Sequence, residues 1–301
     1  MRTIPLNFRL GDVALFSLPL RLSVRLYSLS ELISNSDPTE VVGVRGDLAL
    51  LSCAAGANLP GVMRRDRVIR YIPHTYERFY VDVRGSFEQY LEKFSAKTRN
   101  TSKRKVRKFA EISGGQIDFR EYTTPDAASE FHTIAKELST RTYQERLLKA
   151  GLPTDAAFIA RLRQQAESGA LRAYLLFHEG RPVSYLYCPV EAGTAVYEHL
   201  GFDPEYAKWS PGFVLQWLVL ERLFADSAVE FFDFTQGEGE QKRFFATGSI
   251  RCADVYVLQD RFKIRLMIYG HAWLASLSSG LGTALDAIGL KSRIKRILRR
   301  T

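Results

Sequence analysis

Residues 194–216 (TAVYEHLGFDPEYAKWSPGFVLQ) constrain the fold of this chain more than any other stretch. A run of apolar, β-branched and aromatic residues ends at Gly201, a short loop follows, and Ser210-Pro211-Gly212 opens an almost wholly apolar segment. Ser before Pro is a helix-start signal, with Ser210 as N-cap and Pro211 at the first helical position. A helix that begins directly after a strand presents backbone N–H groups at the positive end of its dipole. This stretch therefore predicts a strand–loop–helix unit with a phosphate site at the helix start.

The composition is that of an ordinary globular protein, with 46% hydrophobic and 25% charged residues over 301 positions. That length allows two domains, or one large domain with an extension. Cys53, Cys188 and Cys252 are widely spaced and form neither a metal pattern nor a disulfide framework, so we expect a reducing compartment and no metal site. The apolar run 13–20 is short and lacks a cleavage site, so we expect no signal peptide.

The net charge of +9 is concentrated in two places. Residues 97–108 (KTRNTSKRKVRK) hold seven basic residues and no acid, and residues 260–301 hold nine Lys or Arg against two acids. Each of these segments carries +7, which leaves about −5 for the rest of the chain. The pattern argues against a general nucleic-acid-coating surface and predicts two discrete anion contacts.

The N-terminal part, residues 1–83, is rich in strand patterns separated by turn residues. Ser86 then starts a helix that we expect to cover 87–110, with Gln89 completing a capping box. Three basic residues of this helix recur at spacings of four: Arg99, Lys103 and Arg107. Like charges one turn apart oppose helix formation, and an anionic partner would relieve them, although a solvated face is the alternative interpretation.

From residue 116 onward the expected order of elements is regular. The expected segments are strand 116–122, helix 125–138 after the cap Thr124, helix 155–167 after the cap Thr154, strands 171–177, 183–190 and 194–202, helix 211–225, strand 229–235, a short helix to 246 and strand 251–258. The loops between the three consecutive strands have hairpin composition. This order predicts an α+β fold with a mixed sheet and helices on both faces, divided as 1–85 (β-rich), 86–259 and 260–301.

The C-terminal tail has two parts. Residues 266–285 contain no Asp, Glu, Lys or Arg, but they include His271 and several Ser, Thr and Gly. They are long enough to cross a membrane but too polar, so we expect a helix packed on the body or lying on a membrane. Residues 290–300 place apolar side chains on one helix face with six basic residues around it. They predict a basic amphipathic helix for an anionic lipid surface, with a frayed, solvated terminus as the alternative.

Four segments in this order resemble the GNAT acyltransferase superfamily: 94–109 (FSAKTRNTSKRKVRKF), 174–187 (YLLFHEGRPVSYLY), 198–215 (EHLGFDPEYAKWSPGFVL) and 231–245 (FFDFTQGEGEQKRFF). The resemblance covers about residues 86–258. It is closest to the branch of the CelD-type acetyltransferases of cellulose biosynthesis, which is akin to the FemAB-like aminoacyl transferases. The chain departs from the superfamily's Gly-rich phosphate loop, because residues 206–212 (YAKWSPG) contain one Gly only.

The resemblance implies a GNAT-like fold and transfer of an acyl group from acyl-CoA, acetyl-CoA or a longer thioester, to an amine. The donor's pyrophosphate would take N–H groups at the helix start, and Lys208 would add charge. The residues expected to bind this co-substrate are Lys208, Trp209, Ser210, Gly212, Phe213 and Val214. An exposed backbone N–H of strand 194–202 would stabilise the oxyanion.

The amine must lose a proton to a base with a pKa near 7. His199 titrates in that range unaided, whereas Glu198 would need burial to raise its pKa. The two residues are adjacent in the expected strand and so point to opposite faces, His199 with Tyr197 and Glu198 with Val196 and Leu200. Only one of them can face the acceptor. A half-buried strand histidine with a satisfied hydrogen bond is the alternative for His199.

A second polar cluster follows the strand that contains Asp233. In the resembling branch a Lys is usual at the place of Lys242, where its ammonium would hold a phosphate or carboxylate, and a surface salt bridge is the alternative. Residues 141–144 (RTYQ) would line the acceptor site, or form a polar loop. The expected catalytic residues are Tyr197, Glu198, His199, Asp233 and Lys242.

Three functions stay open at this point. The first is an N-acyltransferase whose acceptor is an amino sugar or a lipid-linked amine of envelope or polysaccharide synthesis. The second is a FemAB-like aminoacyl transferase whose basic helix meets aminoacyl-tRNA. The third is a non-catalytic scaffold at the membrane. The basic tail and the uncharged segment favour a membrane-proximal acceptor, so we expect a cytoplasmic protein with a peripheral contact to the anionic inner face of a membrane.

Overall fold

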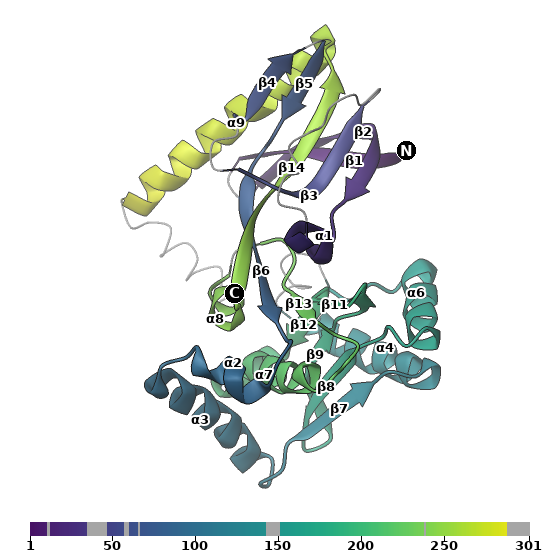
Figure 1. Ribbon diagram of the computed structural model, residues 1–301, viewed down its shortest axis with the longest axis vertical. Helices are drawn as coiled ribbons and strands as arrows, with labels where there is room; N and C mark the ends of the chain where they lie inside the picture. Colours follow the sequence, from purple (N-terminus) through teal and green to yellow (C-terminus); the bar gives the residue numbers. More distant parts are fainter. Residues whose placement is uncertain are drawn as a thin grey trace. The chain divides into compact units, whose positions relative to one another are not determined.

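The computed structural model describes residues 1–10, 13–34, 47–56, 60–65, 67–142, 151–237 and 239–287 (Figure 1). The chain forms two compact units, Met1–Tyr76 with Arg251–Thr301, and Glu77–Ile250. The expected division into 1–85, 86–259 and 260–301 stays a prediction. The expected basic helix over 290–300 lies outside the described residues.

The first unit is built on strands. Its elements are β1 (Arg2–Leu10), β2 (Val13–Leu26), α1 (Leu29–Ser34), β3 (Leu48–Ala54), β4 (Val62–Arg65), β5 (Val68–Tyr71), β14 (Gly248–Gln259) and α9 (Phe262–Ala287). Strands β1 and β2 form an antiparallel pair, β2 runs parallel to β3, and β14 pairs antiparallel with both β3 and β5. The N-terminal strand patterns are confirmed, and the short helix α1 was not expected from them.

The second unit contains two sheets. One has the order β6 (Thr75–Asp82), β13 (Phe231–Asp233), β11 (Thr194–Val196) and β10 (Val190–Glu191). The other has the order β12 (His199–Phe202), β9 (Arg181–Tyr187), β8 (Ala173–His178) and β7 (Asp118–Tyr122). Its helices are α2 (Phe87–Glu92), α3 (Ala96–Ile112), α4 (Pro125–Thr140), α6 (Ala156–Glu167), the 3-10 helix η1 (Pro204–Trp209), α7 (Pro211–Phe224) and α8 (Glu240–Phe245).

Helices cover both faces of the β7–β8–β9–β12 sheet (Figure 1). Along β8, Tyr174 and Leu176 belong to the core cluster that contains the buried face of α7, whereas Leu175 and Phe177 belong to the cluster that contains α4 and α6. This alternation is what the two-residue period of a strand produces when both faces are buried. The expected mixed α+β architecture is confirmed.

Local signals placed several boundaries well. Thr124 caps α4, with its hydroxyl accepting from the Ala127 amide at 3.3 Å. The β8–β9 hairpin turns at Glu179 and Gly180, whose φ angles of 49° and 75° match the left-handed conformation that a type I′ turn requires. The cap of α6 is Asp155, one residue after the expected Thr154.

Two expectations about the second unit were wrong, and a third was confirmed with a different geometry. The helix expected over 87–110 is two helices, because Ser95 caps a new one by accepting from the Thr98 amide at 3.2 Å. The strand expected over 194–202 is divided between the two sheets as β11 and β12. Ser210 is the N-cap of α7 and Pro211 its first residue, as expected, but Ser210 is in a left-handed conformation, φ 56° and ψ 50°, and its side chain makes no cap hydrogen bond. Its conformation follows from η1, whose end it also forms.

Within the part of the chain that the structure describes, no helix combines the length and the apolar character that crossing a bilayer requires.

Candidate active site

The chain passes from one sheet of the second unit to the other between Tyr197 and Glu198. The Tyr197 amide donates to the Asp233 carbonyl at 2.9 Å, whereas the next amide, that of Glu198, donates to the Tyr187 carbonyl at 3.2 Å. The chain thus leaves the partner strand β13 and joins β9 within one residue. Beyond this point β12 and β13 follow different sheets.

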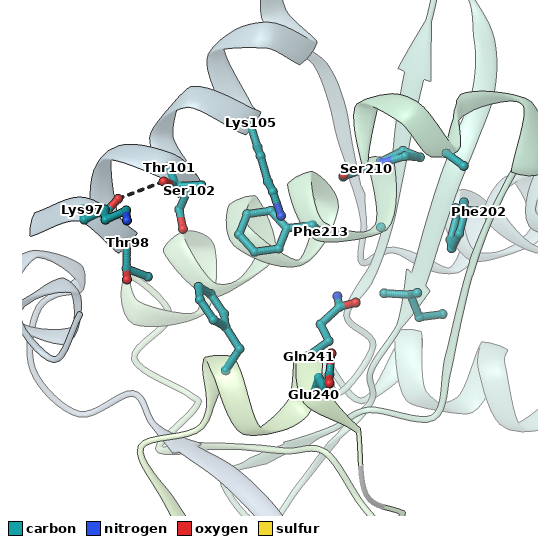
Figure 2. Close-up of a pocket in the computed structure, with 15 residues that line it drawn as sticks. Lys97, Thr98, Thr101, Ser102, Lys105, Phe202, Ser210, Phe213, Glu240 and Gln241 are labelled. Atoms are coloured by element: carbon teal, nitrogen blue, oxygen red, sulfur yellow. Dashed lines mark hydrogen bonds between the residues drawn. The ribbon is translucent and has the colours of Figure 1, made fainter. Parts of the chain in front are cut away.

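A pocket of about 560 Å³ lies at the start of α7 (Figure 2). Four elements line it besides η1: α3, β12, the first turn of α7, and α8. The lining residues are Lys97, Thr98, Thr101, Ser102 and Lys105 of α3, Leu200 and Phe202 of β12, Ala207 and Ser210 before α7, Pro211, Gly212 and Phe213 of α7, and Glu240, Gln241 and Phe244 of α8. The pocket therefore joins an apolar wall to a polar one.

Helix α3 contributes the polar wall. Lys105 Nζ lies 4.2 Å from the centre of the Phe213 ring, a cation–π contact that holds the ammonium above the first turn of α7. Ser102 lines the pocket and is only 2% exposed. Figure 2 shows its hydroxyl on the pocket side of α3. A hydroxyl in this position can donate a hydrogen bond to a ligand in the pocket.

The start of α7 offers fewer donors than expected. The Phe213 and Val214 amides donate to the Ser210 carbonyl at 3.0 and 3.1 Å, so the expectation of three free amides was wrong. The Gly212 amide has no acceptor among the described residues. A Cβ at Gly212 would lie 3.3 Å from Phe202 Cδ1, so glycine allows β12 to approach this turn closely. One amide and the helix dipole remain for an anion.

The expected donor-binding residues divide into two groups. Ser210, Gly212 and Phe213 line the pocket. Lys208, Trp209 and Val214 are not among its lining residues: Lys208 Nζ lies 3.9 Å from the Trp209 ring centre, and Val214 is fully buried.

Sequence reasoning missed the face of α3 that lines the pocket. The basic run 97–108 was recognised, but the expected stripe of Arg99, Lys103 and Arg107 is not on that face. Lys103 and Arg107 are exposed, and Arg107 faces Glu111 at 3.5 Å. The sequence signal for the correct face is the i, i+3, i+4 spacing of the small hydroxyl residues Thr98, Thr101 and Ser102, with Lys97 and Lys105 on either side.

Glu198 and His199 both contact α6. The Glu198 carboxylate pairs with Arg161, whose Nη2 lies 2.8 Å from Oε2. The His199 ring is edge-on to Phe158 at 5.9 Å and stacks on Tyr187 at 6.2 Å between ring centres. Burial lowers the pKa of His199, and the charge of Arg161 lowers it further. Burial raises the pKa of Glu198, against the effect of Arg161.

The expected alternation of faces along this strand was therefore wrong. Tyr197 packs against Phe232 and Phe234, with ring centres 6.0 and 5.8 Å away, which belong to the core cluster that contains the buried face of α7. His199 instead contacts residues of the cluster that contains α4 and α6. The break between β11 and β12 explains the difference, because strand alternation holds only within one continuous strand.

Asp233 and Lys242 lie near Tyr197 but are tied to protein partners. Asp233 is fully buried, with Oδ2 2.5 Å from Arg78 Nη2, and it accepts from the Thr235 amide at 2.8 Å. Lys242 Nζ donates to the Phe234 carbonyl at 2.7 Å and the Gln236 carbonyl at 2.9 Å.

Burial lowers the pKa of Lys242, and the Asp233 charge opposes that shift. None of the five expected catalytic residues lines the pocket. The structure thus brings Tyr197, Asp233 and Lys242 into one group and Glu198 and His199 into another.

Arg141, the first residue of the 141–144 segment, lies beside the buried carboxylate of Asp203. Arg181 Nη2 lies 2.8 Å and Arg141 Nε 3.8 Å from Asp203 Oδ2, and Asp203 is 1% exposed. Thr142 is fully buried, and its hydroxyl donates to the Ser139 carbonyl at 2.8 Å. Residues 143 and 144 lie outside the described residues.

Over the residues that the structure covers, His, Cys, Asp and Glu side chains nowhere gather in threes as a metal ion would need.

A comparison with protein families indicates the class of protein, an acyltransferase. Residues 96–243 match the family model described as the acetyltransferase (GNAT) domain. This segment runs from the first turn of α3 into α8, so it contains all the residues that line the pocket except Phe244.

Solved structures with a similar fold are remote in sequence. The C-terminal domain (DUF2156) of a putative lysylphosphatidylglycerol synthetase from Agrobacterium fabrum is 10% identical, with a TM-score of 0.48 over 79% of this chain and 72% of that one. L-PGS from Bacillus licheniformis is 10% identical, with a TM-score of 0.42 over 77% and 73%. FemX is 9% identical, with a TM-score of 0.44 over 63% of each chain. Likenesses of this size carry no argument about substrate. No curated protein matches the chain.

Proposed function

We propose that this acyltransferase takes its acyl group from an acyl-CoA thioester and transfers it to an amine. The observation that carries the proposal is the pocket at the start of α7, whose lining includes Lys97, Lys105, Ser102 and Gly212. Two ammonium groups, a hydroxyl and a helix-start amide are the donors that a pyrophosphate takes. The single carboxylate on the wall, Glu240, leaves the lysines in excess.

The other wall suits the less polar parts of the same donor. Leu200, Phe202, Phe213 and Phe244 supply apolar and aromatic surface opposite the polar wall. The pocket is also lined by β12, the strand that begins where the chain leaves β13 and joins β9. A donor with its phosphates at α7 would therefore have β12 beside it.

The reaction needs a proton acceptor, and we assign this role to His199, which precedes the pocket-lining Leu200 in β12. The amine nitrogen forms a bond to the thioester carbonyl carbon, the carbon–sulfur bond breaks, and the amine proton passes to the base while the thiolate leaves. With its lowered pKa, the His199 imidazole is neutral at pH 7 and can accept that proton. Glu198 pairs with Arg161, so we assign it a positioning role, in which the ion pair fixes β12 against α6, and not the role of proton acceptor.

For the acceptor we keep the class inferred from the sequence, an amino sugar or a lipid-linked amine. We also propose that the chain belongs to the CelD-type branch of the GNAT superfamily.

Aminoacyl transfer from aminoacyl-tRNA is a second candidate because the outward face of α3 is basic. Lys103, Arg104, Arg107 and Lys108 are exposed along it. Such a face would bind tRNA with a strong dependence on salt, because each phosphate contact releases counterions.

The test is an assay of coenzyme A release with acetyl-CoA and longer acyl-CoAs, using amino sugars and long-chain amines as acceptors. The proposal predicts acceptor-dependent release of free thiol, and loss of coenzyme A affinity in Ser102→Val, with Thr133→Val on α4 as the matched control. No binding of any acyl-CoA, together with salt-sensitive tRNA binding, would favour the second candidate.

A further inference from the structure

Helix α9 has an inner face that is part of the core of the first unit. Ile268 is fully buried and belongs to the same cluster as Leu6 and Leu258. Ile264 and Leu274 pack against that cluster. The helix is thus fixed along one side to the strands of its own unit, with β1 as its main neighbour.

The opposite face of α9 is also apolar, and it is exposed. Its large side chains are between 41% and 76% exposed: Phe262, Leu266, Tyr269, Trp273 and Leu277. Their spacing of four, three, four and four residues confines them to an arc of about 80° at 3.6 residues per turn. We call these five residues the α9 stripe. They are five of the twelve large hydrophobic residues that are exposed in the described part of the chain.

The composition of the α9 stripe is that of a bilayer interface. Trp and Tyr place an apolar ring among acyl chains and a polar atom among headgroups, and Phe and Leu add apolar area. Lys263 and Arg265 flank the stripe on its two sides, one residue on either side of the partly buried Ile264, and Arg265 pairs with Asp260. Lys263 is exposed, and a long basic side chain in such a flanking position reaches toward lipid phosphates.

The chain that follows α9 adds charge of the same sign. Residues 288–301 contain six Lys or Arg and no acid. Each basic residue near an anionic leaflet contributes to attraction, and one apolar element with a polybasic segment makes a stable anchor where either alone is marginal.

We propose that the α9 stripe binds the surface of an anionic bilayer, with the helix axis in the plane of the interface. The in-plane orientation follows from the inner face, because a helix packed on its own strands along one side cannot be surrounded by lipid. A protein partner would have to match five large apolar side chains and also neutralise the basic residues beside and after them. The proposal concerns where the enzyme is placed and does not depend on the donor assigned to the pocket.

The experiment is co-sedimentation of the full chain with vesicles of phosphatidylcholine containing phosphatidylglycerol, and with vesicles of phosphatidylcholine alone, at low and high salt. We expect binding to the anionic vesicles that weakens with salt. The variant Leu266→Ser/Trp273→Ser should bind at least about tenfold more weakly, because two side chains lose their apolar contact. Leu26→Ser, which removes a side chain that is 65% exposed outside α9, should leave binding unchanged.

A second readout separates the stripe from the basic segment. Tryptophan emission should shift to shorter wavelength on anionic vesicles, and Trp273→Phe should abolish the shift while keeping the binding, since Trp209 and Trp217 belong to the other unit. Circular dichroism confirms that the variants are folded. Absence of vesicle binding by the unaltered chain, equal binding by the stripe variant, or a stripe that only drives self-association would each overturn the proposal.

Discussion

The Lys105 ammonium lies 4.2 Å above the centre of the Phe213 ring, and this contact joins the basic helix α3 to the first turn of α7. It places a positive charge where the sequence pattern alone placed Lys208. The consequence is that the charge for a bound anion comes from a helix about a hundred residues earlier in the chain, and not from the loop before α7.

Lys105→Met tests this origin of the charge. The substitution keeps the apolar stem and removes the ammonium, so we expect coenzyme A affinity to fall about tenfold, equivalent to about 1.4 kcal/mol. Isothermal titration gives the affinity directly. The matched control is Lys103→Met, an exposed lysine of the same helix that does not line the pocket, and it should bind as the unaltered chain does. An equal loss of coenzyme A affinity in both variants would contradict a specific contact of Lys105, because it would mean that only the net positive charge of α3 matters.

Gly201→Ala tests how tightly β12 packs against its neighbours. A Cβ there would lie 2.4 Å from Tyr185 Cε1 and 2.8 Å from Thr142 Cγ2, both of them buried side chains. We expect a loss of about 1–3 kcal/mol in the free energy of unfolding, because an overpacked core must shift. Gly239→Ala is the control, since its Cβ would meet only Lys242 Cγ at 3.8 Å. Urea denaturation should show a much smaller change for Gly239→Ala than for Gly201→Ala.

Asp233→Asn separates a structural role from a catalytic one. The substitution leaves the Arg78 guanidinium buried without its carboxylate, which should lower the free energy of unfolding by about 3 kcal/mol or more. Replacing both partners, as Arg78→Met/Asp233→Leu, should recover a large part of that loss. The turnover number of the folded fraction should stay the same in Asp233→Asn. A large fall in turnover without a loss of stability would return Asp233 to the catalytic group.

The pH dependence of kcat/KM tests His199 as the base. Burial and Arg161 both lower its pKa below the ordinary 6.5, so activity should hold to below pH 6.5 and fall only as the imidazole is protonated. Arg161→Gln removes one of the two causes, so the acid limb should move to higher pH. His199→Gln should abolish most of the activity, whereas Glu198→Gln should keep the limb. A limb that disappears only in Glu198→Gln would transfer the role to that carboxylate.

Much of the fold was predictable because its signals are local. Thr124 before Pro125 is a helix-start signal that depends only on neighbouring residues. The Glu179-Gly180 turn is likewise local, because glycine accepts a positive φ. The order of strands and helices after residue 116 followed from such signals. The break in strand 194–202 could not be predicted, because it depends on the Asp233 and Tyr187 carbonyls that its two successive amides find in different sheets.

The site was harder to predict than the fold for the same reason. Ser210, Gly212 and Phe213 lie next to each other in sequence and were found. The partner of Asp233 is Arg78, 155 residues away, so a side chain that looked free for chemistry is held in a buried ion pair. The pocket face of α3 carries a weaker pattern, the hydroxyl residues Thr98, Thr101 and Ser102, than the basic residues at spacings of four that do not line the pocket.

The central claim is that the pocket at the start of α7 holds the phosphates of an acyl-CoA. The most direct measurement is a crystal structure of the chain grown with coenzyme A. Our account predicts the pyrophosphate within hydrogen-bond distance of the Gly212 amide and the Lys105 ammonium, with the Ser102 hydroxyl donating to the same ligand. Coenzyme A bound elsewhere on the chain, or an empty pocket at saturating concentration, would contradict it.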